Sequence, residues 1–240
     1  MNLRRAIKNP GLAVLLILTF TLPPAAAGPA GPTGLVDPYD LALQGMKERF
    51  EALTDYRCLF DSFVTDGRRS QKWTYRYFFK KPDLIRIEVV SGENAGAILI
   101  IRDGKVRAKP AGLLSILSLT FRPDDPRVID VRKNRPDQTP WGYYLDQHLQ
   151  SLDLATVLSS SRDTLDGRPV LVYDIASQDP ARTQGIAREK IWVAIPDDLL
   201  LRYEMYDRAG QLIIMAHFKD ILLDQQLPDS LFKEFKRKFK

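Results

Sequence analysis

The sequence KKPDLIRIE at residues 80–88 joins two alternating runs through a Pro-Asp corner. Before this corner, large aromatic side chains share one parity: Trp73, Tyr75, Tyr77 and Phe79. After it, aliphatic side chains alternate with charged ones: Ile85, Arg86, Ile87, Glu88 and Val89. A period of two over such lengths predicts two strands, each with one buried and one solvated face. The aromatic row fits an ordinary core, and it also fits the floor of a binding surface.

Turn signals divide much of the remaining chain into further strands. Asp-Gly pairs at 66–67, 103–104 and 166–167 predict hairpins between residues 56–65 and 71–80, between 97–102 and 105–109, and between 162–165 and 169–176. Residues 190–195, 199–206 and 211–218 form a predicted meander. Residues 111–121 carry no charge, which fits a buried strand or a lid.

Two helices accompany these strands. Asp37-Pro38 is a typical helix start, and an apolar stripe follows at Leu43, Met46, Phe50 and Leu53. A second helix begins near Thr139-Pro140, with its stripe at Leu145, Leu149, Leu152 and Ala155. Dominant antiparallel strands with two long helices predict an α+β fold.

The N-terminus has the order of a secretory signal peptide. Basic Arg4, Arg5 and Lys8 precede an apolar run over residues 12–22, and small residues end at Ala27. We expect residues 1–27 to be a signal peptide cleaved after Ala27, with a retained membrane anchor as the alternative. Residues 28–36 form a flexible leader, and residues 37–240 form one domain. The mature protein is expected to be soluble in the periplasm or otherwise exported, and the signal looks bacterial.

The net charge is concentrated at the two ends of the chain. The formal net charge is +5, and the signal peptide and the last eight residues carry an excess of basic residues. No basic groove is spread through the domain, so we expect no nucleic-acid partner. The basic segment Lys233–Lys240 is either a solvated end or a peripheral contact with an anionic membrane.

Enzymatic motifs are weak in this sequence. The only histidines are His148, which follows Asp146, and His217, which precedes Asp220. Neither pair makes a metal-ligand set or accompanies a recognised nucleophile motif. The single cysteine, Cys58, lies in a predicted strand and is expected to be a small buried apolar residue. We therefore expect no enzyme, no cofactor and no metal.

Some strands are apolar on both parities. The runs at residues 97–101 and 212–216 are examples. A sheet with one solvated face alternates, so something must cover the second face of these strands. The cover is either helices or an apolar ligand.

The order of these motifs resembles the LolA-like family, whose members include periplasmic carriers of outer-membrane lipoproteins. The resemblance covers most of residues 38–235. It includes an opening amphipathic helix, a basic-basic-Pro turn at residues 80–82, and an apolar strand ending in Asp-Gly-Lys at 103–105. Thr139-Pro140 then opens a helix, and a Phe-containing segment at 227–232 follows the meander. Each motif is weak alone, but five in this order are moderately specific.

The resemblance implies a strongly curved antiparallel half-open β-barrel with helices covering the concave apolar face. That face takes the acyl chains of a lipid anchor in the carriers. It implies an apolar floor made by Trp73, Tyr75, Tyr77, Phe79, Ile85, Ile87, Ile98 and Ile100. The second helix supplies a lid, with Leu145, Leu149 and Leu152 as its candidates. The expected partners are lipid acyl chains or a lipoprotein; the alternative is an envelope regulatory module of the same fold that binds a protein.

One position departs from the family pattern. In the carriers, the second basic residue before the proline is an arginine that holds the lid shut, and Lys81 occupies that position here. Lysine cannot make the planar two-point contact of arginine. Lys81 is therefore the gating candidate, and its chemistry differs from that of the carriers.

Overall fold

Residues 38–112 and 116–235 are described by a computed structural model. The predicted signal peptide, the leader and most of the basic C-terminal segment lie outside these residues. In the described part, the elements follow in the order α1 (Pro38–Ala52), β1 (Asp55–Thr65), β2 (Ser70–Lys80), β3 (Leu84–Ser91), β4 (Ile98–Arg102), β5 (Lys105–Lys109), β6 (Leu119–Phe121), α2 (Trp141–Gln150), β7 (Ala155–Leu165), β8 (Arg168–Ser177), β9 (Arg188–Ala194), β10 (Leu200–Tyr206) and β11 (Leu212–Leu223). Short 3-10 helices lie at Pro136–Gln138 (η2), Leu152–Leu154 (η3) and Asp229–Phe232 (η4).

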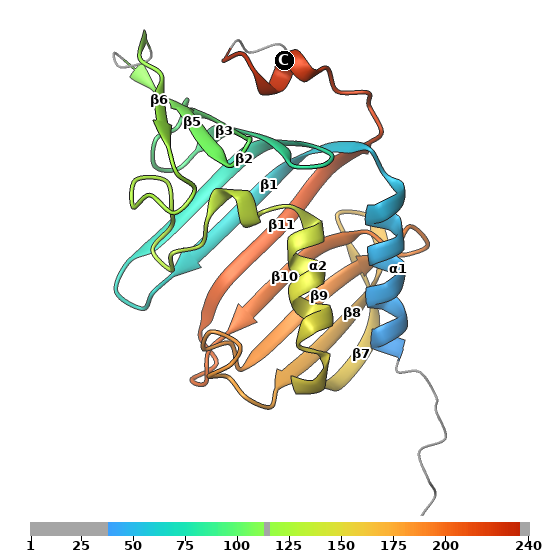
Figure 1. The fold of residues 1–240 in the computed structure, drawn as a ribbon. Helices are drawn as coiled ribbons and strands as arrows, with labels where there is room; N and C mark the ends of the chain where they lie inside the picture. The colour runs from blue at the N-terminus through green and yellow to red at the C-terminus, as the bar shows by residue number, and fades with distance from the viewer. Residues whose placement is uncertain (1–37, 113–115, 236–240) are drawn as a thin grey trace, which may run out of the picture. The chain divides into compact units, whose positions relative to one another are not determined.

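All strands of the described chain form one antiparallel sheet. Its order is β6-β5-β4-β3-β2-β1-β11-β10-β9-β8-β7, so β6 and β7 are free edges and the sheet is not closed. The pairing of β1 with β11 joins the first and last strands of the chain, and the other neighbours are consecutive in sequence. The sheet curves, and α1 and α2 lie against its concave face (Figure 1). The predicted α+β class and half-open sheet are therefore confirmed.

The three predicted Asp-Gly hairpins are present as β1–β2, β4–β5 and β7–β8. Across β1 and β2, Tyr56 pairs with Phe79 and Ser62 with Trp73, so the aromatic row of β2 lies on the concave face beside alternate residues of β1. The uncharged run at 111–121 ends in the short strand β6, and residues 113–115 of it lie outside the described part. No helix in the two described ranges has the length and apolarity that crossing a membrane requires.

The two helices meet over one end of the sheet. Trp141 of α2 stacks on Tyr56 of β1 with ring centroids 4.3 Å apart. Gly142 allows α2 to lie close to α1, because a Cβ atom at this position would lie 2.4 Å from Cε1 of Phe50 on α1. Leu43 and Met46 of the predicted α1 stripe are buried in the same core. Cys58 is buried there too, as expected.

The convex face carries a second, smaller core. Phe78, Ile98 and Ile100 pack there against the C-terminal segment around η4, through Leu227, Leu231 and Phe232. The segment is fixed by Arg86, which is fully buried. Its guanidinium donates to a carboxylate oxygen of Glu88 at 2.7 and 2.9 Å, and to the main-chain oxygens of Leu231 at 2.9 Å and Glu234 at 2.6 Å. The convex face of β3 and β4 is thus covered by chain rather than by solvent.

Replacement of Arg86 tests this arrangement. Arg86→Met leaves the Glu88 carboxylate buried with Arg76 at 3.8 Å, and is expected to lower the free energy of unfolding by about 3 kcal/mol. The double variant Arg86→Met/Glu88→Leu removes both charges and is expected to be less destabilised. Urea unfolding provides the measurement, and Arg122→Met, in an exposed ion pair, is the control with an effect below about 1 kcal/mol. A double variant less stable than Arg86→Met contradicts this account.

Candidate functional site

The concave face holds a cavity of about 1100 Å³ next to the end that the helices cover. Its floor comes from strands on both sides of β1, and its apolar members include Phe60, Val64, Tyr75, Ile87, Val89, Leu99, Ala108, Phe121, Tyr203, Met205 and Ile214. Its walls come from α2, from the β8–β9 loop and from residues 122–139, which we name the strap. The arrangement offers a large, mostly apolar floor beneath polar walls.

The residues of the predicted floor fall into three groups, two of which lie on the concave face. Trp73, Tyr75 and Ile87 line the cavity. Tyr77, Phe79 and Ile85 lie on the same face but are at most 2% exposed, within the core. They sit where the helices cover the strands: Phe79 contacts Phe50 of α1, with 5.7 Å between ring centroids.

Ile98 and Ile100, which are predicted to belong to the concave floor, lie on the convex face instead. In the β3–β4 register, Ile87 pairs with Leu99 while Arg86 pairs with Ile100, so Ile98 and Ile100 point to the convex face. Leu99 is the residue of β4 that lines the cavity. β4 is apolar on both parities, so its sequence alone does not identify the inward face; the pairing with the alternating strand β3 does.

The predicted lid leucines belong to the core rather than to the cavity. Leu145 is 1% exposed, and Leu149 and Leu152 are partly buried against the same core. The helix turns a different side to the cavity, formed by Tyr143, Tyr144, Gln147 and His148. The 3.6-residue period places these residues beside the leucine stripe, not on it.

Lys81 contacts α1 rather than α2. Its ammonium donates to the main-chain oxygen of Glu51 at 2.6 Å and lies 5.1 Å from the ring centroid of Phe50. Its main-chain N–H donates to Thr54 at 3.0 Å. A cation at this point satisfies a free carbonyl at the C-terminal end of α1. The gating role of Lys81 stays a prediction, and its contacts here tie the 80–83 corner to that helix.

A buried polar triad joins α2 to the sheet in the cavity wall. Glu189 of β9 accepts a hydrogen bond from the Tyr144 hydroxyl at 2.7 Å, and its other oxygen lies 2.5 Å from Nε2 of His148. Nδ1 of His148 lies 2.8 Å from the main-chain oxygen of Tyr144. Both ring nitrogens therefore face acceptors, which is the arrangement of an imidazolium that donates twice. Asp146 is the acidic residue nearest to His148 in the sequence, whereas the fold brings Glu189 to it.

The pKa shifts agree with this geometry. Burial alone lowers the pKa of His148, but the charge and hydrogen bond of Glu189 outweigh it, and the net pKa is raised above the ordinary value. Burial, followed by the negative charge of Glu189, raises the pKa of the Tyr144 hydroxyl. Tyr144 is therefore neutral, and the contact with Glu189 favours the protonated form of His148.

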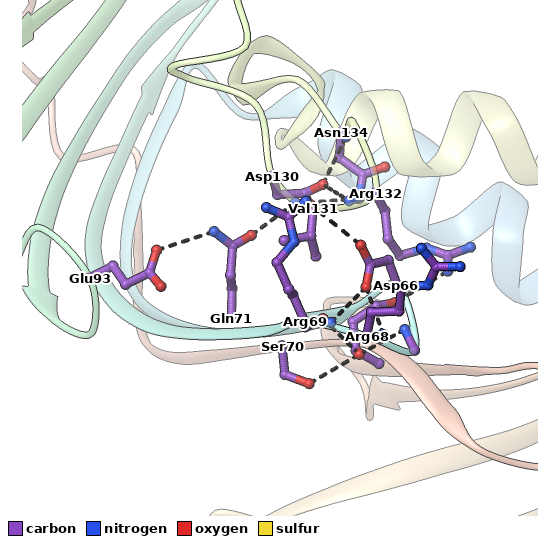
Figure 2. A network of polar contacts seen from close by, with 12 residues as sticks. Asp66, Arg68, Arg69, Ser70, Gln71, Glu93, Asp130, Val131, Arg132 and Asn134 are labelled. Atoms are coloured by element: carbon purple, nitrogen blue, oxygen red, sulfur yellow. Dashed lines mark hydrogen bonds and ion pairs between the residues drawn. The ribbon is translucent and has the colours of Figure 1, made fainter.

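The strap crosses the cavity and is anchored by polar contacts at the β1–β2 turn (Figure 2). The N–H of Val131 donates to the Gln71 side chain at 2.9 Å, and Gln71 donates to Glu93 at 3.3 Å. Arg132 donates to the main-chain oxygens of Thr65 at 3.3 Å and Gln184 at 2.9 Å. The strap is thus linked to the β1–β2 hairpin and to the β8–β9 loop. No pattern in the sequence indicated this segment, because its role depends on what it crosses.

Comparison with known proteins informs the fold only. No protein-family model and no curated protein matches the sequence. Among solved structures, an uncharacterized conserved protein from Thermus thermophilus superposes with a TM-score of 0.52 at 11% identity, over 83% of this chain and 95% of that one. A LolA superfamily protein from Nitrosomonas europaea has a TM-score of 0.37 at 11% identity, over 81% of this chain and 96% of that one. MucB in the Pseudomonas aeruginosa MucA/MucB complex has a TM-score of 0.47 at 15% identity, over 79% of this chain and 59% of that one.

An open, curved antiparallel sheet with helices on its concave face is the LolA-like fold that the sequence motifs predicted. At 11% identity, the likeness to the Thermus thermophilus protein identifies an architecture and not a shared ligand.

The His148–Glu189 pair makes a pH-dependent contribution to stability. The folded pKa of His148 is raised above its unfolded value of about 6.5, so the contribution is complete below that pH and is lost as the pH rises through the folded pKa. The difference in unfolding free energy between the wild type and His148→Gln is therefore expected to be larger at about pH 5.5 than at about pH 9.

Chemical denaturation at both pH values measures this difference. Glu189→Gln keeps an acceptor for Tyr144 but removes the charge, and in that background burial lowers the pKa of His148, so the effect of His148→Gln should no longer be larger at about pH 5.5 than at about pH 9. A wild-type difference that grows with pH would contradict the ion pair.

Proposed function

We propose that the protein binds the acyl chains of a lipid or a lipid-modified protein in the concave cavity. The observation that carries this proposal is an apolar floor beneath a cavity of about 1100 Å³, beside helices that cover only one end of the sheet. Pockets for small organic ligands usually hold about 300–1,000 Å³ and are lined mainly by apolar side chains. The cavity is large enough for an acyl chain.

The driving force for such binding is burial of methylene groups. Each methylene removed from water contributes about 0.8 kcal/mol, so a chain of roughly twelve methylenes gains about 10 kcal/mol before the costs of association are counted. The shape and apolarity of the cavity are sufficient for affinity toward an acyl chain. The floor contributes partly exposed side chains such as Tyr75 and Leu99, which lose their contact with water when a chain lies on them.

The polar groups of the site support binding rather than covalent catalysis. Burial raises the pKa of the Cys58 thiol, which is the opposite of what an attacking thiolate needs. Both carboxylate oxygens of Glu189 are engaged, by Tyr144 and His148. These groups fasten α2 to the sheet.

Filling the cavity tests the proposal. Ala108 of β5 lines the cavity opposite Leu99, and Ala108→Trp is expected to reduce uptake of a fluorescent fatty acid at least about tenfold by occupying the floor. Fluorescence titration measures uptake, and mass spectrometry of an organic extract of the purified protein identifies any acyl species that it retains.

Thr120→Trp is the matched control. Thr120 is exposed in the neighbouring strand β6, pairs with Arg107 and does not line the cavity, so this variant should bind as the wild type does. A wild-type protein that carries no acyl species and takes up no fatty acid overturns the proposal and favours the protein-binding alternative. Equal binding by both tryptophan variants places the ligand elsewhere and also overturns it.

We further propose that the protein works outside the cytoplasm. The support is the basic, apolar and small-residue order of residues 1–27. Mass spectrometry of the protein recovered from a bacterial envelope extract is expected to give an N-terminus at Gly28. A chain that keeps Met1 and stays in the cytoplasmic fraction contradicts export, and one that keeps Met1 in the membrane fraction identifies a retained anchor.

A further inference from the structure

Large apolar side chains are exposed in the segment that leads into β6. Ile116 is 89% exposed, Leu117 46% and Leu119 41%. Leu119 lines the cavity, whereas Ile116 and Leu117 do not. Exposed apolar side chains that lie close together usually mark an interaction surface, because their contact with water is unfavourable. Ile116 and Leu117 are therefore candidates for contact with another molecule.

The neighbouring strand β5 presents a row of cations on the convex face. Arg107 pairs with Ile100, and Lys109 pairs with Ile98. Ile98 and Ile100 pack in the convex core, so the side chains of Arg107 and Lys109 point to the convex side as well. Lys105 has the same parity along β5. One face of this strand thus carries three positive charges.

The C-terminal segment extends this cationic surface. Arg107 donates to the main-chain oxygen of Lys233 at 3.0 Å, and its guanidinium lies 5.0 Å from the ring centroid of Phe235. Lys233 is exposed. Phe235 is the last described residue, and the sequence continues with KRKFK, which has four further basic residues. The basic end of the chain therefore begins beside β5.

Few acidic residues oppose these cations. Residues 102–109 hold four basic residues and one acidic residue, which leaves a net charge of +3. The acidic one, Asp103, forms an ion pair with Arg102 at 3.0 Å. In the C-terminal segment, Asp229 forms an ion pair with Lys80 at 2.7 Å, and Glu234 balances the charge of the lysine before it. The face of β5 is therefore cationic.

The apolar and cationic groups meet at one end of the β5–β6 hairpin. Leu119 pairs with Ala108, and Lys109 is the last residue of β5. Ile116 and Leu117 come just before Leu119, so they lie beyond the last pair of the hairpin, near Lys109. The hairpin forms an edge of the sheet (Figure 1). This edge is thus amphipathic, with two exposed apolar side chains next to a row of cations.

We infer that this edge docks on an anionic phospholipid bilayer, with Ile116 and Leu117 in the interfacial region and Lys105, Arg107 and Lys109 over the headgroups. Apolar side chains enter the boundary between headgroups and acyl chains, and lysine and arginine are attracted to the negative surface. Cations alone would fit any polyanion. The apolar pair beside them favours a bilayer, which offers both chemistries on one surface.

The inference goes beyond the proposed function and does not depend on it. The two are connected in space by Leu119, which lines the cavity and is 41% exposed. The cavity therefore reaches the molecular surface beside the docking edge. A protein docked by this edge holds one side of its cavity close to the lipid.

Vesicle sedimentation tests the inference with the chain from Gly28 to Lys240, which contains every described residue. We expect this chain to bind phosphatidylcholine vesicles that contain about 30% phosphatidylglycerol at least about tenfold more tightly than vesicles of phosphatidylcholine alone. Raising the ionic strength from about 0.05 to about 0.5 M should weaken binding to the anionic vesicles, because salt screens the attraction.

Two double variants locate the docking edge. Lys105→Gln/Lys109→Gln is expected to weaken binding to the anionic vesicles about tenfold or more, since each cation near the surface contributes about fivefold. Ile116→Gln/Leu117→Gln should weaken it by a similar factor, because two side chains no longer leave water. Circular dichroism checks that both variants are folded, as expected for substitutions outside the core.

Matched controls come from β7, the opposite edge of the sheet. Arg162→Gln and Leu158→Gln remove an exposed cation and an exposed apolar side chain there, and both should bind as the wild type does. Equal binding to both kinds of vesicle overturns the inference, as does wild-type binding by both double variants. Binding that depends only on residues 236–240 also overturns it. In each case unchanged uptake of a fatty acid leaves the proposed function standing.

Discussion

The structure depends on a mismatch between a wide sheet and two short helices. The sheet has 11 strands, which extend over about 50 Å along its curve at a spacing of about 4.8 Å. The helices have 15 and 10 residues, or about 22 and 15 Å at a rise of about 1.5 Å per residue. They cover the concave face where Trp141 stacks on Tyr56, and they leave the rest of it open. Closely packed helices thus supply stability at one end, and the cavity lies at the other.

The same mismatch explains which parts of the site could be predicted from the sequence. Alternation at residues 72–89 identified the strands, their turns and the inward face of β2, because period-two patterns report directly on which side is buried. It could not separate Tyr75 from Tyr77, which share that face and differ only in whether a helix lies above them. Composition is the same at both positions, and the distinction is made by a helix that begins 64 residues further along the chain, at Trp141.

The two-faced apolarity of β4 has a different origin from that expected. An apolar second face predicts a cover, and here the cover of the convex side is the segment around η4, held by the fully buried Arg86. Alternation alone predicts that Arg86 and Glu88 are solvated, but in the structure they are 0% and 4% exposed. Charged residues at strand positions mark a face as polar but do not show whether water or chain satisfies it. The arrangement of partners is a property of the fold, as it is for His148 and Glu189.

The open part of the concave face has a cost that bears on function. Partly exposed apolar side chains on a concave floor hold water that makes few hydrogen bonds, and helices long enough to cover them would remove it. The strap crosses this region without filling it, and Arg132 fastens it to the main chain at Thr65 and Gln184. An apolar floor of this kind is completed by an apolar chain, in line with the acyl-chain binding that we propose.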